Sequence, residues 1–452
     1  MSSYQERLLK AIPGGSHTYS RGFDQFPANA PEILSSGSGA YVTDPSGKRY
    51  LDFGMALRSV NIGYSEPEVN AGAIEQIYKG NNLTRASLVE LEAAERLIAT
   101  IDSAEMVKFT KNGSTAVTAA VKLARAFTGR ELIARCSSHP FFSFDDWFIG
   151  DTVMSRGVPA GVSNKTISFQ YNDIESLRRL IDSHPGEIAC VVLEPAATEC
   201  PCVPRGSGIC CESSGQDRST AAGPNFLQQV ESLCKEHGIV FILDEMITGF
   251  RWHDKGAQHV YGVTPDISTF GKAMANGFSV ACVAGRREIM ELGSIEKPGA
   301  ERVFLLSTTH GAEMSSLGAF LATTSFMREH EVVDHIWEFG RQFIARLNRV
   351  AESHDLQEYF KVQGVPCSPY FQVLGEDGLP SLGLRTLLSQ EMVNNGVLMP
   401  WLAFSYRHGE AELGITESAL DKSLLSLKRG ISNGLASVLV GPTIKPVFRK
   451  YN

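Results

Sequence analysis

The sequence predicts an α/β fold: a mainly parallel sheet with helices on both faces, plus a smaller α+β domain built from both ends of the chain. Short, almost wholly apolar segments alternate with helix-like segments through the middle of the chain. Apolar strands in such alternation are typical of parallel sheets buried on both faces. The ends of the chain differ, with a hairpin-like segment near the start and a long amphipathic segment near the end.

The small domain is expected from residues 1–64 and 326–452, and the large domain from residues 65–325. Near the start, GAYVTDPSGKRYLDFG predicts a β-hairpin with DPSG as its turn. Near the end, YFQVLG is strand-like and ESALDKSLLSLKRGISNGLASVL predicts a long amphipathic helix.

Within the large domain, STAVTAAVKLARAFTG predicts a helix that Gly129 can end, with a buried face of Ala116, Val117, Ala120, Val121 and Ala124. Five strand-like runs follow: ELIARC, IACVVLEP, IVFILDE, DISTFGK and ACVAG. Helix-like segments such as FLQQVESLCKEHG separate several of them, which favours a parallel sheet. A sixth run, RVFLL, is also strand-like.

The composition is that of an ordinary globular protein, with 452 residues, 43% hydrophobic and 20% charged. Acidic residues outnumber basic residues 50 to 42, for a net charge of −8, so we expect no nucleic-acid partner and no anionic membrane surface. No apolar run reaches the roughly 20 residues that a membrane span needs, and the first residues lack a signal peptide's apolar segment. We therefore expect a cytoplasmic protein.

The chain has nine cysteines, which fit a reducing compartment if they are unpaired. The loop around residues 198–223 holds a C-x-C and a C-C pair, a spacing unlike the paired C-x-x-C of common zinc sites. We interpret it as an ordinary surface loop, with a metal or redox role as the alternative, and expect no metal in the functional site. Its four cysteines are Cys200, Cys202, Cys210 and Cys211.

Two strand-like runs end in groups that one flat cofactor can satisfy. IVFILDE ends on Asp244 and Glu245, and DISTFGK ends on Lys272. A buried carboxylate is costly without a cationic partner, and open α/β sheets bind ligands at the carboxyl ends of their strands. A lysine desolvated there can become a nucleophile. Pyridoxal 5'-phosphate (PLP) fits both, because its aldehyde suits Lys272 and its pyridine nitrogen suits Asp244.

A phosphate group requires N–H donors, which a helix start provides. KNGSTAV offers one, where Gly113 lets the backbone approach closely and Ser114 and Thr115 add hydroxyl groups.

These residues carry a resemblance. LDEMITGFR and FGKAMANG resemble the aspartate and cofactor-lysine segments of class III (subgroup II) PLP-dependent aminotransferases. Within that class the chain is most similar to the glutamate-1-semialdehyde 2,1-aminomutase branch, through IPGGSHTYSRGF, GAYVTDPSGKRYLDF, GVPAGVSNKTISFQYND and VVLEP. The resemblance runs from about residue 11 to about residue 425.

The resemblance implies a type I PLP-dependent transferase fold and a homodimer with shared active sites. It implies that Lys272 forms the Schiff base with PLP, and that Asp244 keeps the pyridine nitrogen protonated, so that the ring accepts electrons. Gly113, Ser114 and Thr115 would hold the phosphate.

Four further residues take their expected roles from the same resemblance. Thr308 would reach the phosphate bound by the partner subunit, with Thr309 as the alternative. Glu194 belongs to the same signature, with a cofactor-binding or a purely structural role. Arg21 would bind the substrate through a carboxylate or a sugar phosphate, which its bidentate fork suits.

The chain departs from the aminomutase pattern where substrate is read. The Ser-Trp pair of the aminomutase pattern aligns with Ala56 and Leu57 of this chain. The segment PWLAFSYR lacks the glutamate of the pattern's late segment. CSSHPFFSFDDWF replaces its Tyr-His-Gly, so Phe141 or Phe142 could stack on the PLP ring, or both could be core residues. A different substrate on the same chemistry is the simplest interpretation.

Other cationic side chains rank lower as site residues. Arg58, Arg251 and Arg407 are substrate-binding candidates for which a surface salt bridge is the better prediction. A structural hydrogen bond is the better prediction for His17, His139 and His310.

The resemblance leaves three functions open. The first is an aminotransferase that moves an amino group from a small-molecule donor to a keto or aldehyde acceptor through the Lys272 Schiff base and pyridoxamine phosphate. The second is a true glutamate-1-semialdehyde 2,1-aminomutase. The third is a non-catalytic PLP-binding homologue, which the presence of both Lys272 and Asp244 disfavours. An oxidoreductase is disfavoured because no G-x-G-x-x-G follows an early strand.

Overall fold

The computed structural model describes residues 3–201, 223–311 and 313–452. The chain divides into two compact units. The small unit contains Met1–Glu66 and Asp334–Asn452, and the large unit contains Pro67–Val333. The cysteines Cys202, Cys210 and Cys211 of the expected surface loop lie outside the described residues.

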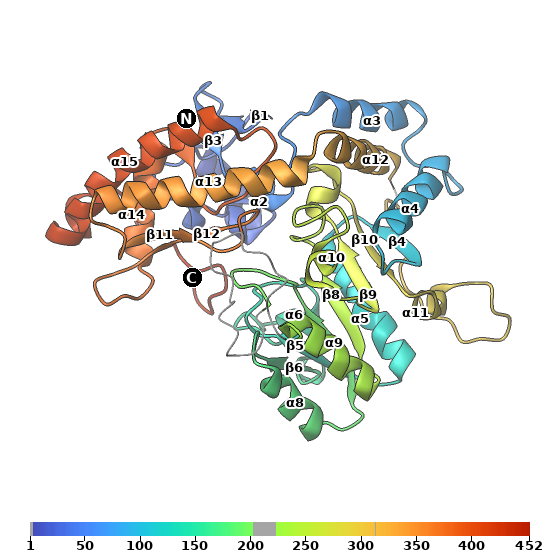
Figure 1. The fold of residues 1–452 in the computed structure, drawn as a ribbon. Coiled ribbons are helices and arrows are strands. Elements are labelled where there is room, and N and C mark those ends of the chain that lie inside the picture. Colours follow the sequence, from blue (N-terminus) through green and yellow to red (C-terminus); the bar gives the residue numbers. More distant parts are fainter. Residues whose placement is uncertain (1–2, 202–222, 312) are drawn as a thin grey trace. The chain divides into compact units, whose positions relative to one another are not determined.

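The large unit is built on a seven-stranded sheet with the order β4-β10-β9-β8-β7-β5-β6 (Figure 1). Only β10 runs antiparallel to its neighbours, so the predicted α/β class with a mainly parallel sheet is confirmed. The strands are β4 (Met106–Thr110), β5 (Leu132–Cys136), β6 (Thr166–Phe169), β7 (Ile188–Leu193), β8 (Val240–Asp244), β9 (Ile267–Phe270) and β10 (Ala281–Gly285).

Four of the large unit's long helices begin after a residue whose side chain caps the helix: α4 (Leu88–Thr100), α5 (Gly113–Thr128), α8 (Ile174–Ser183) and α9 (Phe226–His237). Helix α5 begins after the N-cap Asn112 and ends at Gly129, which takes the left-handed conformation that favours glycine. The other helices of the large unit are α3 (Pro67–Tyr78), α6 (Asp146–Ile149), α7 (Ala160–Ser163), α10 (Ala257–Tyr261), α11 (Arg287–Met290) and α12 (Met314–Glu329).

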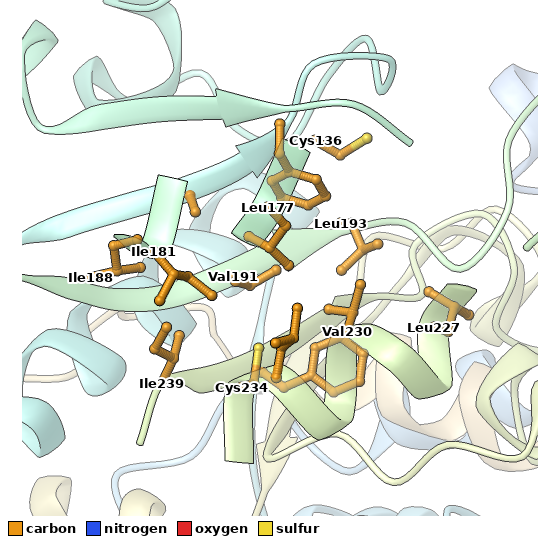
Figure 2. Close-up of a cluster of buried hydrophobic side chains, with 14 of the residues drawn as sticks. Cys136, Leu177, Ile181, Ile188, Val191, Leu193, Leu227, Val230, Cys234 and Ile239 are labelled. Atoms are coloured by element: carbon orange, nitrogen blue, oxygen red, sulfur yellow. The ribbon is translucent and has the colours of Figure 1, made fainter. Parts of the chain in front are cut away.

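A buried cluster joins β5, β7 and β8 to helices α8 and α9 (Figure 2). Leu177 and Ile181 come from α8, and Val230 comes from α9. Burying a side chain of this size stabilises the fold by roughly 1.5–3 kcal/mol. In β8, Phe241 and Leu243 belong to this cluster, so the alternate residue Asp244 points to the opposite face of the sheet.

The small unit contains the predicted β-hairpin. β2 (Tyr41–Thr43) pairs antiparallel with β3 (Arg49–Asp52), and the Asp44 carboxylate accepts hydrogen bonds from the turn amides of Ser46 and Lys48. The unit's other elements are α1 (Tyr4–Ala11), β1 (Ser36–Ser38), α2 (Met55–Arg58), α13 (Val332–Ser353), β11 (Phe360–Gln363), β12 (Tyr370–Val373), α14 (Leu382–Asn394), β13 (Val397–Leu398) and α15 (Glu410–Asn433).

One predicted strand is wrong. Residues 302–306, RVFLL, form no strand, because their backbone makes no ladder: the Val303 N–H donates to the Leu292 carbonyl, and the Phe304 carbonyl accepts from the Lys122 side chain. Phe304 is largely exposed. None of the helices in the described parts of the chain is long and apolar enough to cross a membrane.

Candidate functional site

Six parallel strands of the large unit end at one edge of its sheet, and most of the predicted cofactor residues follow these ends. Helix α5 starts after β4, Phe141 and Phe142 follow β5, and Glu194 follows β7. Asp244 is the last residue of β8, and Lys272 follows β9 by two residues. Ligands of open α/β sheets bind at such edges.

Asp244 is a buried carboxylate, and one of its two oxygens accepts hydrogen bonds from described residues. Its Oδ1 accepts hydrogen bonds from the backbone N–H of Met246 (3.0 Å) and from the hydroxyl of Thr269 on the neighbouring strand (3.1 Å). Its Oδ2 accepts no hydrogen bond from any residue that the structure describes. Burial raises the pKa of Asp244 to about 6, although the positive charge of Lys272 opposes the rise.

Lys272 opens a short 3-10 helix (Lys272–Ala275) and has a left-handed backbone, with φ at 43°. Such a conformation is strained for a residue with a side chain, and strain of this kind is concentrated at functional sites. The positive charge of Lys272 acts on the Asp244 carboxylate, so the two predicted catalytic residues interact electrostatically.

Glu245 points away from Asp244, as strand alternation predicts. Its buried carboxylate accepts hydrogen bonds from the Thr248 hydroxyl, the Ala257 N–H (2.9 Å) and the Gln258 N–H (2.8 Å). The last two donors lie at the start of α10, where a helix attracts negative charge. Glu245 is therefore a structural partner of α10.

Met246 is a site residue that the sequence analysis missed. A Cβ atom on Gly113 would lie 2.8 Å from the Met246 sulfur, and one on Gly271 would lie 2.6 Å from it. Met246 thus fills the space between the start of α5 and the backbone just before Lys272, and its N–H bonds Asp244. Strand β8 ends at Asp244 and Met246 lies in the turn that follows, so strand alternation could not have identified it.

The first turn of α5 is tied to the loop that carries Phe141. The Ser114 hydroxyl accepts a hydrogen bond from the Phe144 N–H (3.2 Å), and the Ser143 hydroxyl donates to the Ser114 carbonyl (3.3 Å). The Asn112 side chain caps the helix by accepting from the N–H (2.9 Å) and hydroxyl (3.0 Å) of Thr115.

The two phenylalanines after β5 differ in exposure. Phe142 is 2% exposed and packs edge-to-face against Phe148, so it is a core residue. Phe141 is 47% exposed, with one contact to the Phe148 ring. Only Phe141 therefore has a face available for stacking on a flat ligand.

Glu194 follows β7 as a buried residue, and its backbone N–H donates to Nδ1 of His139 (3.0 Å). Burial lowers the pKa of His139 to about 3, so this imidazole is neutral and accepts through Nδ1. His139 is thus a structural histidine, packed against Tyr171.

Thr308 and Thr309 lie in an exposed loop of the large unit. Their backbone carbonyls accept hydrogen bonds from the Gly311 N–H (3.2 Å) and the Asn82 side chain (3.0 Å). Their hydroxyl groups make no hydrogen bond with any described residue, so the structure of one chain does not bring them to Asp244.

Arg21 lies in the small unit, where it lines a cavity of about 710 Å³. The lining is mostly apolar and includes Phe23, Leu57, Trp401 and Pro442. Arg21 ends a 3-10 helix (Tyr19–Arg21) and is separated by Gly22 alone from a second one (Phe23–Gln25).

A left-handed turn forms another wall of this cavity. Residues 55–58 have φ values of 39°, 46°, 63° and 66°, an unusual run for side-chain-bearing residues. The buried Asp52 carboxylate holds the turn by accepting from the N–H groups of Gly54 (2.7 Å) and Met55 (3.1 Å) and from the Tyr64 hydroxyl (2.6 Å). Trp401 donates its indole N–H to the Gly54 carbonyl (2.9 Å).

The lower-ranked arginines have other surroundings. Arg407 forms a bidentate ion pair with buried Glu66 at 2.8–3.1 Å, which confirms a structural role. Arg251 is fully buried, and Arg58 belongs to the left-handed turn. His17 and His310 are exposed.

The large unit's sheet edge fits PLP. The Asp244 Oδ2, which bonds no described residue, could accept from a protonated pyridine nitrogen, and the Lys272 amine could bind the aldehyde. The N-terminus of α5 offers backbone N–H groups to a phosphate. Fold and site together define a PLP-dependent enzyme of the aminotransferase kind.

The comparison with known proteins narrows the class. Residues 25–371 match the profile of the family described as Aminotransferase class-III, and the chain belongs to that family. It is therefore a PLP-dependent class III aminotransferase.

The chain is similar over nearly its whole length to several characterised proteins. It is 29% identical over 433 residues to a 3-aminobutyryl-CoA aminotransferase of Cloacimonas acidaminovorans (strain Evry), covering 95% of this chain and 97% of the relative. An omega-transaminase from Sphaerobacter thermophilus superposes with a TM-score of 0.78 at 25% identity, covering 94% and 97%. The PLP internal aldimine form of FumI from Sphingopyxis sp. MTA144 has the same fold, with a TM-score of 0.81 at 23% identity, covering 94% and 96%.

Proposed function

We propose that this enzyme transfers an amino group between two separate molecules, from an amine with an anionic substituent to a keto or aldehyde acceptor. The observation that carries the proposal is the buried Asp244 carboxylate, with Oδ2 unbonded to the described residues and the charge of Lys272 acting on it. PLP supplies the electron sink and the carrier of the amino group.

The chain's own residues have distinct parts in this proposal. Lys272 would hold the cofactor through its amine, and the same amine, once free, could move a proton of the substrate. Asp244 keeps the pyridine nitrogen protonated, and the Met246 and Thr269 bonds fix its orientation. Gly113, Ser114 and Thr115 hold the phosphate at the start of α5, and Phe141 stacks on the ring.

The donor proposed here carries its amino group on a carbon other than the α-carbon. The support is the names of two relatives, a 3-aminobutyryl-CoA aminotransferase and an omega-transaminase. Both names describe transfer between molecules, which favours an aminotransferase over an aminomutase. The segment IPGGSHTYSRGF, with Arg21, favours intramolecular transfer of the glutamate-1-semialdehyde type as the second candidate.

We also propose a homodimer with shared active sites. Thr308 and Thr309 have exposed hydroxyl groups that bond no described residue, so they are available to a phosphate bound by a second copy of the chain. Apolar side chains on α3 and α4 support a second copy as partner, because Tyr78 and Leu88 are largely exposed.

Product analysis with purified holoenzyme tests the main proposal. The enzyme is incubated with pyruvate and, in turn, with 15N-labelled β-amino acids and ω-amines. An aminotransferase forms 15N-alanine and a keto or aldehyde product in equal amounts. A rearranged amine with no released carbonyl product would show an aminomutase, and an unchanged cofactor spectrum across the whole panel would show a non-catalytic protein.

A further inference from the structure

The C-terminal tail, residues 434–452, follows the last helix of the small unit and is anchored at one side to α14. The Val440 N–H donates to the Gln390 side chain (2.7 Å), and the Ile444 N–H donates to the Thr386 hydroxyl (3.1 Å). The tail therefore has fixed positions along its length.

The other side of the tail contacts the segment that follows Arg21 through hydrogen bonds and an ion pair. The Lys445 N–H donates to the Asp24 carbonyl (2.9 Å), and the Gln25 side chain donates back to the Lys445 carbonyl (3.0 Å). The Arg449 guanidinium forms an ion pair with the Asp24 carboxylate at 2.5 Å, with side chains only 27% and 32% exposed. Gly441 packs against Ala28, since a Cβ there would lie 2.6 Å from the Ala28 methyl group.

Two consecutive 3-10 turns connect these contacts to Arg21. The two 3-10 turns on either side of Gly22 are closed by the bonds from the Gly22 N–H to Tyr19 and from the Gln25 N–H to Gly22. A Cβ on Gly22 would lie 2.7 Å from Asp24 Oδ1, so the Asp24 carboxylate sits directly against the residue that follows Arg21. Both Arg21 and Pro442 of the tail line the same cavity.

We infer that the C-terminal tail is a wall of the substrate cavity, and that Arg449 acts through Asp24 as a positioning residue that aims Arg21 at the anionic group of the donor. This rests on the proposed function of Arg21. The tail then contributes to the enzyme's preference for acidic over uncharged amines.

The test uses two donors of the same chain length, 3-aminobutyrate and 2-aminobutane, with holoenzyme. The ratio of their kcat/KM values should fall about tenfold in Arg449→Ala, through KM of the acid, because small misplacements of a binding group have effects of this order or larger. Arg449→Lys should retain part of the ratio, and the charge-swapped double variant Asp24→Arg with Arg449→Asp should restore it. Arg341→Ala, which removes an exposed ion pair with Glu338 elsewhere in the small unit, should leave the ratio unchanged.

Hydrogen exchange gives a readout independent of turnover. The amides of Gly22 and Gln25 should exchange faster in Arg449→Ala than in the Arg341→Ala control. An unchanged ratio and unchanged exchange in Arg449→Ala, with the ratio collapsed in Arg21→Ala, would overturn the role of the tail alone. An unchanged ratio in Arg21→Ala would instead overturn the proposed role of Arg21, and the inference with it.

Discussion

At the residue scale, two effects act on the ionisation of Asp244: burial disfavours the charged carboxylate, and the positive charge of Lys272 favours it. Burial raises its pKa from 3.8 to about 6. A folded-state pKa above the unfolded value means that this group's stabilisation is complete below about pH 4 and is lost as the pH rises through about 6. In the cofactor-free protein the loss amounts to about 3 kcal/mol.

Asp244→Asn should remove this pH dependence, since asparagine does not titrate. The free energy of unfolding of the cofactor-free variant should therefore gain about 3 kcal/mol relative to wild type between pH 4 and pH 7. Urea unfolding at both pH values measures the difference, and Asp182→Asn on the exposed face of α8 is the control. A constant difference across the range would contradict the assignment, as would full turnover in the Asp244→Asn holoenzyme.

Glu245→Gln should act on the fold rather than on the cofactor. Every described hydrogen-bond partner of this carboxylate is a donor, so an amide group would face at least one N–H with its own N–H. We expect a loss of about 1–3 kcal/mol in urea unfolding, with PLP affinity nearly unchanged in an absorbance titration. If Glu245→Gln lost PLP while Asp244→Asn retained it, the roles of the two carboxylates would be reversed.

Asp244 and Lys272 could be identified as a pair from sequence because each ends a strand-like run, and parallel strands end at one edge. Thr269 and Met246 could not be assigned in the same way. Thr269 meets Asp244 through the pairing register of β8 and β9, which depends on the whole sheet. The place of Met246 depends on how closely α5 approaches the backbone before Lys272.

At the scale of elements, the approach of α5 to that backbone is set by two glycines and one sulfur. Gly113→Ala should cost about 1–3 kcal/mol, because its methyl group would lie 2.8 Å from the Met246 sulfur. In a Met246→Ala background most of that loss should disappear. Urea unfolding of the four proteins gives the coupling energy, and Gly161→Ala in α7, where a Cβ meets nothing within 4 Å, is the control. Additive effects would show that Met246 does not fill this space.

Strands were predictable where side chains are apolar on both faces, as in the run that forms β7. The RVFLL segment shows why apolarity alone was insufficient, since its backbone pairs with no strand although most of its residues are apolar. The antiparallel direction of β10 could not be deduced either, because a buried strand has the same composition in both directions.

At the scale of the whole molecule, shared active sites predict complementation between an inactive variant, Lys272→Ala, and a variant with weakened PLP binding, Thr308→Ala. If Thr308 acts across the dimer, a mixed dimer of Lys272→Ala and Thr308→Ala chains has one site with both defects and one with neither, so activity recovers on mixing. Thr308→Ala alone should weaken PLP binding by roughly 1.5–3 kcal/mol. If mixing restores nothing, Thr308 serves its own chain, and a fully active monomer in sedimentation would exclude shared sites altogether.

The substrate was less predictable than the cofactor. The cofactor residues follow strands of one sheet, whereas the cavity with Arg21 is built by the start of the chain, a left-handed turn and the tail, segments with no common periodicity. Arg21 was named from family resemblance, and its contact with the tail segment could not be read from sequence.

Borohydride reduction of the holoenzyme followed by peptide mapping identifies the lysine that binds PLP, because reduction makes the covalent link between PLP and its lysine permanent. We expect one pyridoxyl-labelled residue, Lys272, and no label in a Lys272→Ala protein that retains its circular dichroism spectrum. Label on another lysine, such as Lys111 beside the start of α5, would contradict the assignment of this site.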